Sequence, residues 1–327
     1  MKLTEIERLY RIASKELKDK ENFPAHFLYK KIEMENIFKK VIPKTGGICL
    51  EIGCGNGFQS ALLSCFAKRL VATDLYHFDQ KTHTMGMALA KDLNKYLNRS
   101  NVRFVACSAT MLSFKPNSFD FILINSALEH IEDKKKAVEE IFYALCPGGV
   151  VVVGVPNFIT DFFLFTHLYL YIIKRIFDIV CIKFFKRKPK DANIFSKSYN
   201  NSNRNLASIW SSFRKNYPSF PFPVPHGDWK DRNGKLSFFE EFKNSFPWKW
   251  EQLLKSSGLR VIKTFALLFV PFPIFEPFST RLWIWFHNSI KKIHFVLCDS
   301  VLKYFSITYC LIAKKELIWE RENHPLR

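Results

Sequence analysis

Three glycines at alternate positions follow a short apolar run, and this feature constrains the fold more than any other. Residues 50–57 read Leu-Glu-Ile-Gly-Cys-Gly-Asn-Gly, and a helix is expected to follow from Phe58 to Lys68. Glycines at such a turn allow backbone conformations closed to other residues and let a ligand approach closely. The unpaired N–H groups at the start of the helix favour a polar or anionic ligand. The turn therefore predicts a site for a nucleotide-like cofactor.

Two other glycine-rich turns fit the sequence less well. A dinucleotide-binding turn needs a third glycine where Phe58 stands, and a P-loop needs Gly-Lys-Ser/Thr, which does not follow here. A tight turn that binds no ligand is the remaining alternative. Three glycines together with Glu51 in one turn argue against it.

The pattern Glu-x-Gly-x-Gly-x-Gly at residues 51–57 resembles motif I of the class I S-adenosylmethionine-dependent methyltransferases, in particular the type 11 group. Between residues 47 and 157 the other family segments follow in order and at family-like spacing. The resemblance implies an α/β fold with a Rossmann-like, doubly wound sheet of seven strands. The sheet is expected to be mostly parallel with an antiparallel last strand, and helical insertions are expected after strands five and six. The later strands are expected at Arg69–Asp74, Val102–Ala106, Val150–Val155, Leu259–Phe265 and Phe305–Lys314, and the fourth strand with its exit loop is expected within Ser118–Ile131.

The resemblance also implies a binding site for S-adenosylmethionine. Asp74, at the end of the second strand, would accept hydrogen bonds from both ribose hydroxyls. Ser108 stands where the family usually has an aspartate that receives the adenine amino group, so a hydrogen bond there would lack charge assistance. The residues expected to bind the cofactor are Glu51, Gly53, Cys54, Gly55, Asn56, Gly57, Asp74, Leu75, Ser108, Ala109, Asn125 and Ser126.

Two histidines are candidates for a catalytic base. A base is needed only if the acceptor has a proton to lose, because the main demand is alignment of a nucleophile with the sulfonium methyl. His130 lies just past the fourth strand, and His226 lies in a proline-flanked turn. Either can instead be a structural hydrogen-bonding residue. Glu129 is expected to face solvent or to cap the next helix, and no cluster of residues suggests a metal site.

Charge and aromatic content favour an anionic or amphipathic partner. The formal net charge is +19, aromatics make up 16% of the residues, and 34 of these are phenylalanine. Residues 158–190 combine large apolar side chains with a basic cluster, but the uncharged run Phe162–Ile173 is shorter than the roughly 20 residues that cross a bilayer. This composition suits a helix in the membrane interface. A buried helical pair and a nucleic-acid-binding patch are the alternatives.

The segments divide the chain into four parts. Residues 1–46 are expected to be a helical lead-in, 47–157 the cofactor-binding core, 158–246 an insertion that acts as a lid, and 247–327 the rest of the methyltransferase fold. A second aromatic insertion, about 267–304, suits a membrane interface or a core helix. The stretch from His226 to Leu259 is similar to a subgroup of bacterial methyltransferases encoded with surface-polysaccharide or lipid-modifying enzymes.

The sequence therefore predicts an S-adenosylmethionine-dependent methyltransferase that acts on a lipid, a lipid-linked sugar or another amphipathic small molecule, with oxygen as the methylated atom. An RNA methyltransferase and a non-catalytic membrane-binding scaffold are the alternatives. Eight scattered cysteines, expected as reduced thiols, indicate a cytoplasmic protein. We expect peripheral contact with the inner face of an anionic membrane, and nucleic acid is the less favoured partner.

Overall fold

The structure is a computed structural model that describes Arg8 and residues 23–41, 47–75, 78–79, 84–162, 238–268 and 297–316. The chain forms two compact units. The first comprises Met1–Asn157 and Phe246–Arg327, and the second comprises Phe158–Ser245. Within the second unit, α8 (Phe238–Asn244) brings Phe242 against Phe158, with ring centroids 5.9 Å apart.

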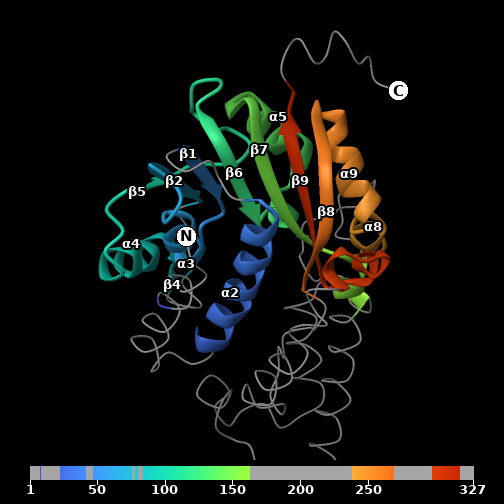
Figure 1. Ribbon diagram of the computed structural model, residues 1–327, viewed down its shortest axis with the longest axis horizontal. Coiled ribbons are helices and arrows are strands. Elements are labelled where there is room, and N and C mark those ends of the chain that lie inside the picture. Colours follow the sequence, from blue (N-terminus) through green and yellow to red (C-terminus); the bar gives the residue numbers. More distant parts are fainter. Residues whose placement is uncertain are drawn as a thin grey trace, which may run out of the picture. The chain divides into compact units, whose positions relative to one another are not determined.

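The first unit is built on a seven-stranded sheet (Figure 1). The strands lie in the order β5-β2-β1-β6-β7-β9-β8, which is 3-2-1-4-5-7-6 when only the strands of this sheet are counted along the chain. Strand β9 runs antiparallel to β7 and β8, and the other pairs are parallel. This confirms the predicted Rossmann-like, mostly parallel sheet of seven strands with an antiparallel last strand. Most of the residues of the two predicted insertions lie outside the described residues. The strands are β1 (Ile48–Ile52), β2 (Arg69–Asp74), β5 (Val102–Ala106), β6 (Phe119–Asn125), β7 (Leu145–Pro156), β8 (Leu259–Leu268) and β9 (Thr308–Lys315).

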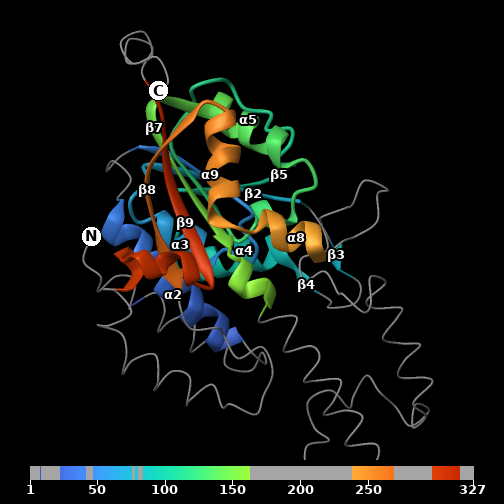
Figure 2. The ribbon, with the colours of Figure 1, turned by 90° about the vertical axis from the view of Figure 1, so that its right-hand side faces the viewer.

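Helices cover both faces of this sheet (Figures 1 and 2). On one face α2 packs against α3 and β8, and α3 packs against α4. On the other face α5 packs on β7 and α9 packs on β8. The bounds are α2 (Phe23–Lys40), α3 (Phe58–Leu63), α4 (Gly86–Tyr96), α5 (Lys134–Ala144) and α9 (Pro247–Ser256), with short 3-10 helices η1 (Leu128–His130) and η2 (Val301–Phe305) and a separate hairpin of β3 (Phe78–Asp79) and β4 (Thr84–Met85).

The core lies between the sheet and its helices because alternate strand residues point to opposite faces. On the α2 side, Met34, Ile37 and Phe58 pack against Phe121 and Leu123 of β6. The intervening residues Ile122 and Ile124 are also fully buried. Strand β6 is therefore apolar almost throughout, as expected for a central parallel strand.

Several element boundaries differ from the sequence prediction, and β8 runs to Leu268 rather than ending at Phe265. Helix α3 ends at Leu63 rather than continuing to Lys68, because the Asn101 side chain binds the carbonyls of Ser64 and Ala67, both at 2.8 Å, and holds a turn. Strand β7 begins at Leu145, before the Pro-Gly-Gly turn expected to open it, and β9 begins at Thr308, after Phe305. Among the described helices, none combines the length and the apolar character needed to cross a membrane.

Candidate active site

The glycine loop joins β1 to α3 at the point where the strand order reverses, since β2 lies on one side of β1 and β6 on the other. Ligands of open α/β sheets bind at the carboxyl ends of the strands beside such a point. All three loop glycines have positive φ, at +77° for Gly53, +49° for Gly55 and +76° for Gly57. The loop thus adopts a conformation that other residues rarely take.

The middle glycine differs from the other two in what surrounds it. A Cβ on Gly53 would lie 2.4 Å from the Cβ of Ala127, and one on Gly57 would lie 2.6 Å from the Cβ of Ala90. A Cβ on Gly55 would meet no atom of the described residues within 4 Å. The outer glycines thus allow close packing inside the protein, whereas Gly55 borders open space that a ligand can occupy.

Asp74 lies beside this open position. Its Oδ2 accepts a hydrogen bond of 2.7 Å from the Gly55 N–H. The N–H groups of Gly53 and Cys54 donate to the carbonyl of Thr73, at 2.8 and 3.0 Å, so the loop is tied to the end of β2. The glycine loop and Asp74, both predicted to bind the cofactor, therefore lie next to each other. Leu75, the next residue, is exposed.

Glu51 is buried behind the loop rather than on it. The Ser60 hydroxyl of α3 donates to Oε2, and Oε1 has no hydrogen-bond partner among the described residues. Burial raises the pKa of Glu51 to about 8, with a further rise from Asp74, while Ser60 and Lys30 act in the opposite direction. The carboxyl group therefore keeps its proton at neutral pH, which makes it a hydrogen-bonding support for the loop.

Replacing Glu51 with glutamine tests this protonation. The folded-state pKa of about 8 lies above the ordinary value of 4.5, so the folded wild type holds one extra proton between those values and loses stability as pH rises through that window. Glutamine has no proton to lose. We therefore expect the free energy of unfolding of Glu51→Gln, relative to that of the wild type, to increase by about 2–4 kcal/mol between pH 5 and pH 9. Urea denaturation at both pH values measures this, and parallel curves for the two proteins would contradict it.

The loop after β5 provides the third predicted contact region. Its first residue, Cys107, donates its N–H to the carbonyl of Asp74 at 3.0 Å, so the loop starts beside the ribose-binding candidate. Ser108 Oγ lies 2.9 Å from Thr110 Oγ1 and accepts from the Thr110 N–H at 3.3 Å. Ala109 is buried. Thr110 was not among the predicted site residues, although a hydroxyl two positions after Ser108 is visible in the sequence.

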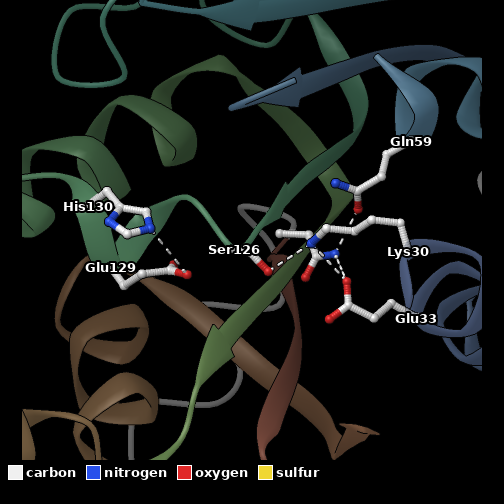
Figure 3. A network of polar contacts seen from close by, with 7 residues as sticks. Lys30, Glu33, Gln59, Ser126, Glu129 and His130 are labelled. Atoms are coloured by element: carbon white, nitrogen blue, oxygen red, sulfur yellow. Dashed lines mark hydrogen bonds and ion pairs between the residues drawn. The ribbon is translucent and has the colours of Figure 1, made fainter. Parts of the chain in front are cut away.

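The end of β6 carries a buried polar cluster (Figure 3). The Asn125 amide nitrogen donates to Glu33 Oε2 at 2.8 Å and to Gln59 Oε1 at 2.7 Å. Lys30 Nζ donates to Glu33 Oε2 at 2.9 Å and to Ser126 Oγ at 3.0 Å, and Ser126 has a φ of +56°. The cluster thus joins α2 and α3 to the loop after β6.

Three members of this cluster were missed by the sequence analysis, which treated α2 only as a lead-in. Lys30, Glu33 and Gln59 are all less than 10% exposed. A signal for the first two was present, because they stand three residues apart beside the buried Ile32 and Met34. Charged residues on the apolar face of a helix are rarely fully buried unless they are paired. Gln59 carries no comparable signal.

The short helix η1 holds the catalytic candidate His130 and also Glu129, whose environment differs from the prediction. His130 remains accessible, with 54% of its side chain exposed. Glu129 was expected to face solvent or to cap a helix, but it is buried, and its Oε1 lies 4.0 Å from His130 Nε2. The cap of α5 is Asp133, which accepts from the Lys136 N–H at 2.9 Å. His226, the other candidate, lies outside the described residues.

The sheet order, the glycine loop and the carboxylate on the adjacent strand together define a nucleotide-cofactor-binding α/β protein of the class I methyltransferase type. Comparison with known proteins agrees, since residues 50–153 match the family model described as a methyltransferase domain. Residues 50–153 thus form a methyltransferase domain of the S-adenosylmethionine-dependent type, and S-adenosylmethionine is the cofactor of such domains.

Each of the relatives matches this chain over only part of its own length. An uncharacterized protein of Methanocaldococcus jannaschii is 34% identical over 125 residues, which cover 38% of this chain and 51% of that protein. A demethylmenaquinone methyltransferase of Clavibacter sepedonicus is 30% identical over 115 residues, covering 35% and 43%. The chain spans about half the length of the curated relatives it matches. A solved S-adenosylmethionine-dependent methyltransferase from Mesorhizobium loti is 13% identical, with a TM-score of 0.45 over 86% of this chain and 97% of that one.

Proposed function

We propose that this protein transfers a methyl group from S-adenosylmethionine to an amphipathic small molecule. The observation that carries the proposal is the open space at Gly55, bordered by Asp74 and situated where the strand order reverses. A nucleoside fits this arrangement because glycine permits its close approach and the carboxylate accepts hydrogen bonds from ribose hydroxyls. When bound, the cofactor supplies an electrophilic methyl group.

The chain's own residues would bind and orient the two reactants. Asp74 would hold the ribose, and Ser108 would contact the adenine. Lys30, which donates to Ser126 and is ion-paired with Glu33, would hold the loop after β6 in position at the same edge. His130, accessible on η1, would take a proton from the acceptor where one must leave. Exclusion of water would complete the arrangement.

A lipid, a lipid-linked sugar or a similar molecule with an oxygen nucleophile is the acceptor we favour. The aromatic and basic composition supports it, because such side chains suit both an apolar acceptor and an anionic membrane surface. A relative named for demethylmenaquinone supports a small organic acceptor over RNA. Another, a ubiquinone/menaquinone biosynthesis C-methyltransferase of Hydrogenovibrio crunogenus, leaves carbon as a second candidate for the methylated atom. We place the protein in the cytoplasm, in peripheral contact with the inner membrane face.

Labelling with a methyl-tritiated cofactor tests the acceptor class. The protein would be incubated with labelled S-adenosylmethionine and cell extract, and the extract would then be separated into lipid, RNA and soluble small-molecule fractions. We expect label in the lipid or small-molecule fraction, and none above background with the Asp74→Ala variant. Label confined to RNA would overturn the choice of acceptor. Cofactor binding without labelling of any fraction would favour the scaffold.

A further inference from the structure

The short helix η2 exposes four apolar side chains in five residues. Val301 is 79% exposed, Phe305 61%, Leu302 45% and Tyr304 40%. Single exposed apolar residues are ordinary, but a contiguous group of them on a protein surface usually marks an interaction site. We therefore define Val301, Leu302, Tyr304 and Phe305 as the η2 patch.

Hydrogen bonds hold η2 in place, so its exposure is a feature of the folded unit. Ser300 caps the helix by accepting from the Leu302 N–H at 3.1 Å. The Asn157 amide donates to the carbonyl of Tyr304 at 2.8 Å, and Lys303 Nζ donates to the carbonyl of Thr264 at 3.3 Å. These contacts attach the helix to the end of β7 and to β8.

The η2 patch lies at the same edge of the sheet as the cofactor site. Asn157 directly follows β7, which runs parallel to β6 and β1, so it marks the carboxyl end of these strands. The glycine loop follows β1 at this edge, and Ser126 follows β6. Helix η2 precedes the antiparallel strand β9, whose first residues therefore pair with the last residues of β7 (Figure 1).

Lysines flank the η2 patch. Lys303 belongs to η2 itself, and Lys40, in the last turn of α2, forms an ion pair with Asp299 just before η2. Burial raises the pKa of the neighbouring Cys298 thiol to about 12, and the positive charges of Lys40 and Lys39 oppose that rise, which places both close to this segment. Because Lys40 is paired with Asp299, we consider Lys39 and Lys303 as the cations beside the apolar side chains. Such a surface, in a chain of net charge +19, fits an anionic lipid surface.

We propose that the η2 patch docks this protein onto anionic phospholipid membranes. The apolar side chains of Val301, Leu302 and Phe305 enter the boundary between headgroups and acyl chains, and Lys39 and Lys303 meet the phosphates. Docking then brings the cofactor-binding edge of the sheet to the membrane surface. The inference extends the proposed function, but vesicle binding does not require methyl transfer, so the two can fail separately.

Vesicle flotation with the full chain tests the docking surface. The vesicles would contain phosphatidylcholine alone or phosphatidylcholine with 30% phosphatidylglycerol. We expect the wild type to float with the anionic vesicles only, and the double variant Val301→Ser/Phe305→Ser to bind them at least about tenfold more weakly. Lys39→Gln is expected to weaken binding by about fivefold, because one cation near such a surface contributes about 1 kcal/mol.

Matched controls separate docking from folding and from self-association. Tyr143, on α5, is 52% exposed, and Tyr143→Ser should bind vesicles like the wild type. Each variant should keep the thermal midpoint and the S-adenosylmethionine affinity of the wild type. The proposal is overturned if the wild type does not bind anionic vesicles or if the double variant binds them equally well. A change from dimer to monomer on size-exclusion chromatography in the double variant would also overturn it, because the patch would then join two copies of the chain.

Discussion

Replacing Gly55 with valine is expected to lower the affinity for S-adenosylmethionine by about 100-fold or more. Two effects combine. A backbone φ of +49° is strained for a β-branched residue, at a cost of about 1–3 kcal/mol. The valine side chain would also fill the space within 4 Å that is open beside Gly55. Strain at Gly55 itself displaces the loop from the conformation that binds the cofactor. Since about 1.4 kcal/mol changes a dissociation constant tenfold, this displacement and the exclusion together account for such a loss. Calorimetric titration of wild type and variant measures it.

A second glycine provides the matched control for Gly55. Gly258 precedes β8 with a φ of +86°, outside the glycine loop. Gly258→Val introduces comparable backbone strain without placing a side chain at the proposed cofactor site. We expect it to lower the thermal midpoint while leaving the cofactor affinity within about twofold. Unchanged affinity in Gly55→Val would show that the loop does not bind the cofactor.

Lys30→Met is expected to destabilise the protein by about 3–5 kcal/mol, because it leaves the carboxylate of Glu33 buried without its paired charge. Methionine is unbranched and only one heavy atom shorter than lysine, so the change removes the ammonium group while keeping most of the packing. The effect extends to the loop after β6, since Lys30 also donates to Ser126. Urea denaturation at pH 7 gives the free energy of unfolding of both proteins.

The double variant Lys30→Met/Glu33→Met distinguishes loss of the ion pair from loss of packing. Replacing both partners of a buried pair with apolar residues is often nearly neutral, whereas removing one partner is costly. We expect the double variant to recover at least half of the stability lost in Lys30→Met. A single variant within 1 kcal/mol of the wild type would show that the pair contributes little. A double variant as unstable as the single one would show that packing, not charge, dominates.

The sequence predicted the central part of the fold because its signals are local. Strand β2 has the predicted bounds Arg69–Asp74, and β5 has the predicted bounds Val102–Ala106, since a short run rich in apolar residues and ended by a turn indicates a strand. The glycine loop and Asp74 lie together because both follow neighbouring parallel strands. Motif spacing is sufficient for predictions of this kind.

What the sequence did not predict depends on contacts between distant segments. The hydrogen bond between Lys30 and Ser126 joins residues 96 positions apart in the sequence, and that between Asn125 and Gln59 joins residues 66 positions apart. The early end of α3 depends on Asn101, which belongs to the turn before β5. Glu129 is buried although its neighbour His130 is exposed, which a 3-10 turn allows and local composition does not reveal. Periodicity reports which face of an element is apolar but not which polar residue meets a partner across the fold.

A crystal structure of the complex with S-adenosylhomocysteine tests the central claim most directly, because this product shares the nucleoside of the cofactor. The account predicts that the ribose hydroxyls donate to the carboxylate of Asp74 and that the ligand lies against the backbone of Gly55. A ligand bound elsewhere, or side chains of this protein filling the space beside Gly55, would contradict it.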